Sequence, residues 1–142
     1  MSVEFDHGAS RMVTTGGDFS IKLWDFANMT SAFEPFRTLD PIPGDPPRSV
    51  VFNKSSTLML RSGGNSKPKI MTRDGRVEIE FIKGDMYITD AKYTKGHIGI
   101  VTSGEWHPIQ DNLCMTSSLD STIRLWDITA QKVGLSQLLP SV

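Results

Sequence analysis

Two segments of the chain, 14–25 and 116–127, repeat nearly the same sequence. In both, an aspartate follows a threonine by four residues, and a tryptophan follows that aspartate by six. Both segments end in isoleucine, a basic residue, leucine, tryptophan and aspartate. Internal similarity of this kind is the sequence signature of a repeat architecture, in which each unit packs only against its neighbours. The chain is therefore expected to build a row of similar units.

Each repeated segment contains a strand in which apolar and polar residues alternate. Ile21 and Leu23 fall on one face, and Lys22 and Trp24 fall on the other. A period of two that includes a β-branched residue indicates a β-strand. A short turn that ends in the aspartate precedes the strand, and another apolar run precedes the turn, so each unit is at least a β-hairpin.

The middle of the chain keeps the strand pattern but loses the polar pattern. We predict strands at 49–52, 57–60, 69–72 and 77–82, with a tight turn at Asp74-Gly75 between the last two. Alignment of the glycine pairs places Arg61, Asn65 and Met71 where the first unit has Thr14, Asp18 and Trp24. We expect a degenerate unit held by packing alone. The three predicted units are 1–47, 48–84 and 85–142, and they are lengthened by a proline-rich loop at 40–47 and an insertion at 83–95.

The two repeated segments resemble WD repeats, the units that form the blades of β-propellers. The resemblance implies an all-β fold: a partial WD-repeat β-propeller of about three four-stranded antiparallel blades. In that family, a loop histidine, a serine or threonine, the turn aspartate and the tryptophan form one hydrogen-bonded structural network. The matching residues are His97, Thr116, Asp120 and Trp126 in the last unit, and Thr14, Asp18 and Trp24 in the first.

Three blades are too few to close a ring. By the spacing in the last unit, the histidine of the first unit would stand before Met1. Closed propellers have about 4–8 blades, and an open row exposes an apolar face at each end. The sequence is therefore expected to be a fragment, and we expect that copies can cover each other's open faces.

Composition narrows the function classes. With 15 basic and 16 acidic residues, the chain has a formal net charge of −1, which gives no electrostatic reason to expect nucleic acid or membrane binding. Cys114 is alone, so no disulfide framework is expected, and this fits a reducing compartment. No apolar run reaches transmembrane length, and we expect no signal peptide. We expect no cofactor and no small-molecule substrate.

Two chemical interpretations compete with the structural network. Thr116, His97 and Asp120 could be taken for a hydrolase triad, but that chemistry requires an exposed hydroxyl and an oxyanion hole. His7 and His107 could be taken for metal ligands together with His97, but no cysteine pair or zinc-site spacing accompanies them. We therefore expect that the protein is not an enzyme and that it binds no metal.

The local basic cluster consists of Arg61, Lys67, Lys69, Arg73 and Arg76. Clustered basic residues form binding surfaces for nucleic acid or for acidic chains. A solvated blade rim has the same composition, and the neutral chain as a whole favours the rim. Binding of nucleic acid or chromatin through 61–76 stays as the alternative function.

A narrower resemblance is to one nuclear group of WD-repeat proteins. It is carried by 13–17, 22–29, 73–75, 81–88, 93–97 and 103–108, and most specifically by 82–97. The resemblance implies a nuclear, non-catalytic scaffold that binds other proteins and is linked to cullin-RING ubiquitin ligases, histone monoubiquitination, chromatin proteins and the response to DNA breaks. Ligase adaptors often dock on Trp-Asp-x-Arg, and the chain has Ala27 and Thr129 in place of that arginine. If adaptor docking occurs, we expect it to use blades outside this chain.

Overall fold

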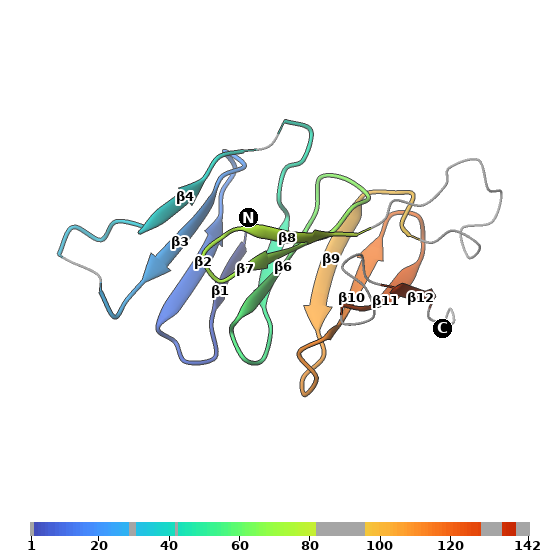
Figure 1. Cartoon of the computed structure of the whole chain (residues 1–142). Coiled ribbons are helices and arrows are strands. Elements are labelled where there is room, and N and C mark those ends of the chain that lie inside the picture. The colour runs from blue at the N-terminus through green and yellow to red at the C-terminus, as the bar shows by residue number, and fades with distance from the viewer. Residues whose placement is uncertain (1, 29–30, 42, 82–95, 129–134, 139–142) are drawn as a thin grey trace.

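A computed structural model describes residues 2–28, 31–41, 43–81, 96–128 and 135–138. All regular secondary structure in these residues is β-strand. The strands form three four-stranded antiparallel sheets, which we call blades 1, 2 and 3 (Figure 1). This architecture confirms the predicted fold class.

Each blade is a simple meander, because neighbouring strands along the chain pair with one another. Blade 1 consists of β1 (Ser2–Phe5), β2 (Arg11–Thr15), β3 (Ile21–Asp25) and β4 (Arg37–Leu39). Blade 2 consists of β5 (Ser49–Phe52), β6 (Leu58–Ser62), β7 (Lys69–Thr72) and β8 (Val77–Glu80). Blade 3 consists of β9 (Val101–Trp106), β10 (Leu113–Ser118), β11 (Ile123–Asp127) and β12 (Leu135–Leu138).

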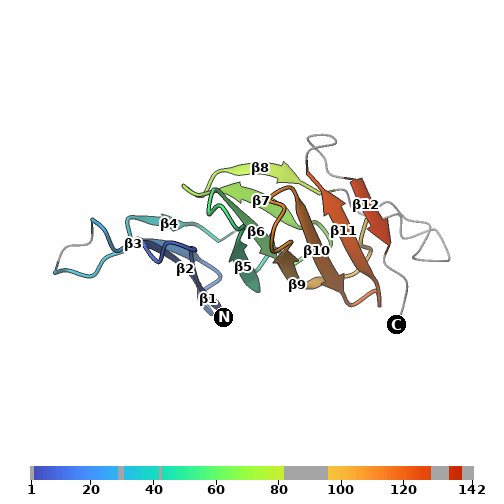
Figure 2. The same cartoon turned by 90° about the horizontal axis from the view of Figure 1, so that it is seen from below.

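The blades are arranged as a fan. The first strands lie on the inner side, where β5 contacts both β1 and β9. The last strands, β4, β8 and β12, lie on the outer side (Figure 2). This is the arrangement of neighbouring blades in a propeller, where the inner strands face the axis.

Blade 2 is buried on both faces, because it lies between the other two blades. Val13, Ile21 and Leu23 of blade 1 pack against a group of apolar side chains on one face of blade 2, namely Val50, Phe52, Met59 and Met71. On the other face, Leu60 and Ile70 pack against Trp106, Cys114 and Trp126 of blade 3. Burial on both faces explains the consecutive apolar residues in β5, β6 and β7, whereas the outer strand β8 is largely exposed and alternates apolar with charged residues.

A tight turn joins β7 to β8, as predicted from Asp74-Gly75. Gly75 has a φ of +91°, a left-handed conformation that glycine adopts without steric cost. Its N–H donates to the carbonyl of Thr72 at 2.9 Å. The turn reaches across to blade 1, since a Cβ at this glycine would lie 3.0 Å from the Leu39 side chain.

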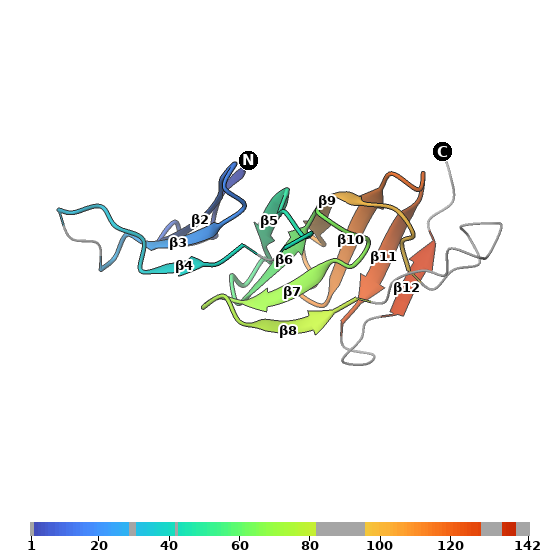
Figure 3. The ribbon, with the colours of Figure 1, turned by 90° about the horizontal axis from the view of Figure 1, so that it is seen from above.

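Each end blade has a face that points away from blade 2, and no other strand of the described residues packs on either of these two faces (Figure 3). On blade 1, Val3 and Phe5 of β1 are 61% and 51% exposed, and Phe5 stacks on Phe26 at 5.9 Å. On blade 3, Met115 and Ile123 are 43% and 46% exposed. These side chains have the opposite parity along their strands to the residues buried against blade 2, so they belong to the two open sheet faces.

Candidate functional site

Four side chains of blade 3 form one chain of hydrogen bonds. Nε1 of Trp126 on β11 donates to Oγ1 of Thr116 on β10 at 2.8 Å. The Thr116 oxygen accepts this bond, and the Thr116 hydroxyl donates to His97, with 2.6 Å between Oγ1 and Nε2. Nδ1 of His97 donates to Oδ2 of Asp120 at 3.2 Å. The structure thus brings together the four residues that the WD resemblance singles out in this unit.

The protonation states follow from burial and hydrogen bonding. Burial lowers the pKa of His97 below its ordinary value of 6.5, although the nearby Asp120 opposes this effect. Burial alone would raise the pKa of Asp120, but hydrogen bonds from Thr122 and from the Ile98 N–H outweigh burial and lower it. A neutral imidazole therefore lies beside an ionised carboxylate, and that carboxylate holds the β10–β11 turn.

The network serves the fold rather than a reaction. His97, Thr116 and Trp126 each have an exposed fraction of 0%. A nucleophilic hydroxyl must reach its substrate, and the Thr116 oxygen is enclosed by its two partners. What the network achieves is the pairing of an indole N–H that would otherwise be buried without a partner, at a cost of about 1–3 kcal/mol.

In blade 1 the corresponding residues do not form a network. Trp24 Nε1 donates to Thr14 Oγ1 at 3.0 Å, as in blade 3. Asp18, however, is exposed and accepts hydrogen bonds from Ser20, at 3.1 Å from its N–H and 2.9 Å from its hydroxyl. These bonds lower the pKa of Asp18, and the hydroxyl bond contributes most. Trp24 itself is only half-buried, because it lies on the open face of blade 1.

Blade 2 is not held by packing alone, which corrects the sequence prediction. Asp45, in the loop before β5, accepts from Arg61 Nη1 at 2.6 Å and from Lys69 Nζ at 2.7 Å. Its backbone carbonyl accepts from Arg61 Nη2 at 2.6 Å. The exposed fractions are 3% for Asp45, 5% for Arg61 and 7% for Lys69. A buried ion cluster thus occupies the place of the hydrogen-bonded network.

Sequence reasoning missed Asp45, although one signal was present. Asp45 precedes Arg61 by 16 residues, close to the 19 residues between His97 and Thr116. Arg61 aligns with Thr116, so an acid in the preceding loop takes the position of the histidine. The surrounding prolines indicated only an irregular connector.

The predicted basic surface at 61–76 does not form as a unit. Arg61 and Lys69 are buried in the ion cluster, since each pairs with Asp45. Lys67 pairs with Glu80 at 3.2 Å on the surface of blade 2. Arg73 points to blade 1 and pairs with Asp6 at 3.0 Å, which leaves Arg76 as the member that is exposed without an ion pair among the described residues.

The three histidines lie apart. His7 in the β1–β2 turn contacts Ser56 of blade 2 through its N–H, and His107 accepts backbone N–H groups of its own turn. Within the described ranges, no group of three or more His, Cys, Asp or Glu side chains has the geometry to hold a metal ion. No helix in the same ranges is long and apolar enough to cross a membrane. Cys114 is a core residue between blades 2 and 3, and its burial raises the pKa of the thiol to about 12.

The family comparison agrees with the fold. The family described as WD domain, G-beta repeat matches residues 1–25 and 90–127, the segments of blades 1 and 3 that carry the repeated sequence. The β-propeller domain of Cps50 (Swd1) from Myceliophteria thermophila superimposes with a TM-score of 0.76 at 18% identity, and it covers 100% of this chain and 39% of that one. This chain belongs to the WD-repeat family.

Within that family, the chain is similar to relatives from Homo sapiens and Drosophila melanogaster. The chain is 38% identical over 135 residues to WD repeat-containing protein 70 of Homo sapiens, a match that covers 95% of this chain and 21% of the relative. It is 39% identical over 121 residues to the Gastrulation defective protein 1 homolog of Drosophila melanogaster, with 85% and 18% covered. The chain therefore spans about a fifth of the length of these relatives.

Proposed function

We propose that this chain is part of a nuclear WD-repeat scaffold that recruits partner proteins to cullin-RING ubiquitin ligases in the response to DNA breaks. The support for the nuclear and ligase links is the resemblance at 38% identity over 95% of the chain to WD repeat-containing protein 70. A WD-repeat propeller is typically a non-catalytic platform for protein binding, and function is argued from its surface rather than from the fold alone.

The observation that carries the scaffold role is that the constellation most like an active site is enclosed. Thr116, His97 and Trp126 satisfy one another inside blade 3, and none of them reaches solvent. Hydrolase activity that disappears in a folded Thr116→Ala variant would contradict the non-catalytic role.

Adaptor binding is proposed to use other blades of the scaffold. The tryptophan-aspartate pairs of this chain continue with Phe26-Ala27 and Ile128-Thr129, so both lack the docking arginine. This chain then contributes partner recruitment and a rigid segment of the ring. Nucleic-acid binding through 61–76 is disfavoured, because Arg61 and Lys69 are buried against Asp45.

Proximity labelling in cells tests this proposal. A labelling enzyme is placed on the full-length protein, either with this segment intact or with Trp126→Ala, which removes the network. The intact protein is expected in the nucleus, and its labelled neighbours should include cullin-RING ligase components. Cytoplasmic localisation, or labelling without any ligase component, would contradict the nuclear and ligase assignments.

A further inference from the structure

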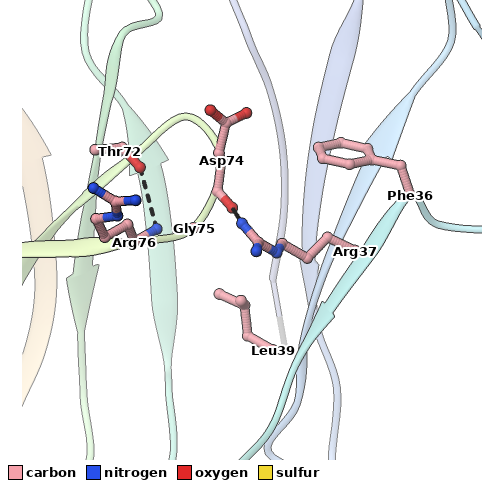
Figure 4. Close-up of a pocket in the computed structure, with 7 residues that line it drawn as sticks. All are labelled: Phe36, Arg37, Leu39, Thr72, Asp74, Gly75 and Arg76. Atoms are coloured by element: carbon pink, nitrogen blue, oxygen red, sulfur yellow. Dashed lines mark hydrogen bonds between the residues drawn. The ribbon is translucent and has the colours of Figure 1, made fainter.

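A cleft lies on the outer side of the fan between β4 of blade 1 and the β7–β8 turn of blade 2 (Figure 4). It contains two hollows, of about 830 Å³ and about 220 Å³. Leu39 and Gly75 line both, so the two hollows meet at these residues. Both blades that flank the cleft are part of the described structure, and blades added at the open end faces would not cover it.

The larger hollow, which we call the arginine hollow, has a net positive charge, because two arginines and one carboxylate, Asp74, line it. Exposed Arg37 comes from blade 1 and exposed Arg76 from blade 2. Arg37 donates one bond, at 2.6 Å, to the backbone carbonyl of Asp74. Neither arginine has an ion pair among the described residues. The Asp74 carboxylate pairs with Arg11 at 3.2 Å. This single carboxylate therefore does not neutralise the charges of Arg37 and Arg76.

The smaller hollow, which we call the apolar hollow, accepts a different group. Its walls include Ile21, Leu39 and Met71, together with Phe19 and Val77, which are 51% and 46% exposed. Exposed apolar side chains around a concave site contribute strongly to protein binding when a partner covers them. Asp40 also lines this hollow and repels an anionic group there, so the two hollows differ in the ligand chemistry they select.

We propose that this cleft binds an acidic peptide segment of a partner protein. Carboxylate side chains of the segment contact Arg37 and Arg76, and an adjacent large apolar side chain fills the apolar hollow. Arginine recognises carboxylates through paired N–H donors, and Arg37 retains most of its five. The inference rests on the proposed scaffold function and defines the chemistry of one partner. A nucleic acid would satisfy the arginines but has no aliphatic group for the apolar hollow.

Fluorescence anisotropy with a designed peptide tests the proposal. The probe is fluorescein-labelled Gly-Ser-Asp-Asp-Leu-Phe-Gly-Ser, and its partner probe has Lys-Lys in place of Asp-Asp. The wild-type chain should bind the acidic probe in preference to the basic one. The double variant Arg37→Gln/Arg76→Gln should weaken that binding by at least about tenfold, because charge-assisted hydrogen bonds are lost.

Controls separate the cleft from nonspecific charge and from unfolding. Lys54→Gln removes an exposed cation that lines neither hollow, and it should leave the affinity unchanged. Amide NMR of the wild-type chain gives a second readout, in which the acidic probe should shift the Gly75 and Arg76 resonances most. Equal binding of both probes, wild-type affinity in the double variant, or largest shifts in blade 3 would each overturn the proposal.

The result also distinguishes the cleft from the broader function. If the wild-type chain fails to bind the acidic probe while proximity labelling recovers ligase components, the cleft proposal is wrong and the scaffold proposal stands. If the probe binds as expected but no ligase component is labelled, the cleft is retained and the ligase link is lost.

Discussion

Two threonines that occupy equivalent positions have different surroundings. Thr116 lies at the centre of a buried network, between an indole and an imidazole. Within the part of the chain that the structure describes, the Thr14 side chain bonds only to the indole of Trp24, which is half-buried on an open face. The contribution of the same sequence motif to stability therefore depends on whether the histidine and a neighbouring blade are present.

Replacing each threonine by valine tests this difference. Thr116→Val leaves the Trp126 N–H and a nitrogen of His97 buried without partners, and it should lower the free energy of unfolding by about 2–4 kcal/mol. Thr14→Val is the matched control and should lower it by less than about 1 kcal/mol, because water can reach that site. Chemical denaturation of the two variants gives the comparison. Equal losses would mean that the network in blade 3 is not assembled.

The lowered pKa of His97 predicts an acid-sensitive fold. Burial holds the folded-state pKa below 6.5, so below that pH the unfolded chain binds a proton that the folded chain does not. Stability should therefore fall as the pH decreases from about 7 toward about 5, with a slope of at most about 1.4 kcal/mol per pH unit from this residue. Asp120, whose pKa is also lowered, adds a further loss only at more acidic pH.

Thermal unfolding across this pH range provides the measurement, and His97→Gln provides the reference. The variant should be less stable near neutral pH and should lose the part of the pH dependence that belongs to His97. If wild-type stability instead rose as the pH fell through this window, the imidazole would be protonated in the folded state.

Among the strands and loops, blade 2 differs from blade 3 because a buried cluster of ion pairs takes the place of the hydrogen-bonded network. The loop before β5, strand β6 and strand β7 each contribute one member, Asp45, Arg61 and Lys69. The cluster fixes the loop against the blade, and the backbone of Asp45 packs closely against Gly64. A Cβ at Gly64, whose φ is +78°, would lie 2.6 Å from that backbone. Nε of Arg61 has no partner among the described residues, so the cluster is incompletely satisfied.

Removal of the single acid should be costly. Asp45→Asn removes the buried counter-charge of both cations and leaves Lys69 only the half-exposed Glu80 carboxylate, so it should destabilise the fold by about 3–5 kcal/mol. The control is Glu80→Gln, because the Glu80 carboxylate lies 3.7 Å from Lys69 but is 46% exposed, and a change of less than about 1 kcal/mol is expected there. Urea denaturation measures both. A small effect of Asp45→Asn would mean that water enters the cluster.

The glycine pair Gly63-Gly64 before β7 allows a second test of the contact between this turn and the loop that carries Asp45. Gly64→Ala places a Cβ against the Asp45 backbone in a left-handed conformation, which alone costs about 1–2 kcal/mol. Gly17 is the aligned glycine of blade 1, and a Cβ there would meet no other atom within 4 Å. Gly17→Ala should therefore change stability by less than about 0.5 kcal/mol. Similar melting temperatures for the two variants would argue against the tight loop contact.

The strands were predictable because their pattern is local. The predicted ranges 49–52 and 69–72 coincide with β5 and β7, and the Asp74-Gly75 turn lies where expected. The buried ion cluster was not predictable, because charged residues are usually exposed unless they are paired. The pairing depends on Asp45, whose position in a proline-rich connector is set by tertiary contacts. The predicted insertion at 83–95 lies outside the described residues.

At the scale of the whole molecule, the fan has two unequal interfaces. Between blades 2 and 3, Phe81 stacks on Trp126 at 4.3 Å, and Trp106 donates to the Val51 carbonyl at 2.8 Å. Between blades 1 and 2, an apolar core is supplemented by polar contacts such as the ion pair of Arg73 with the buried Asp6 carboxylate. Aromatic stacking adds to the stability gained from buried area, and among the described residues such a stack joins blade 2 to blade 3 but not blade 1 to blade 2, so we expect blade 1 to separate first under denaturing conditions.

The three blades form an open row with exposed apolar side chains at each end. Val3 and Phe5 at one end and Met115 and Ile123 at the other are large apolar side chains exposed to solvent. Faces of this kind favour association, because burying them releases water from apolar surface. Light scattering of the purified chain over a range of concentrations measures whether copies of the chain associate through these faces. The expected result is a mass that is a multiple of 15.7 kDa and rises with concentration. A mass of 15.7 kDa at every concentration, together with one cooperative unfolding transition, would contradict it.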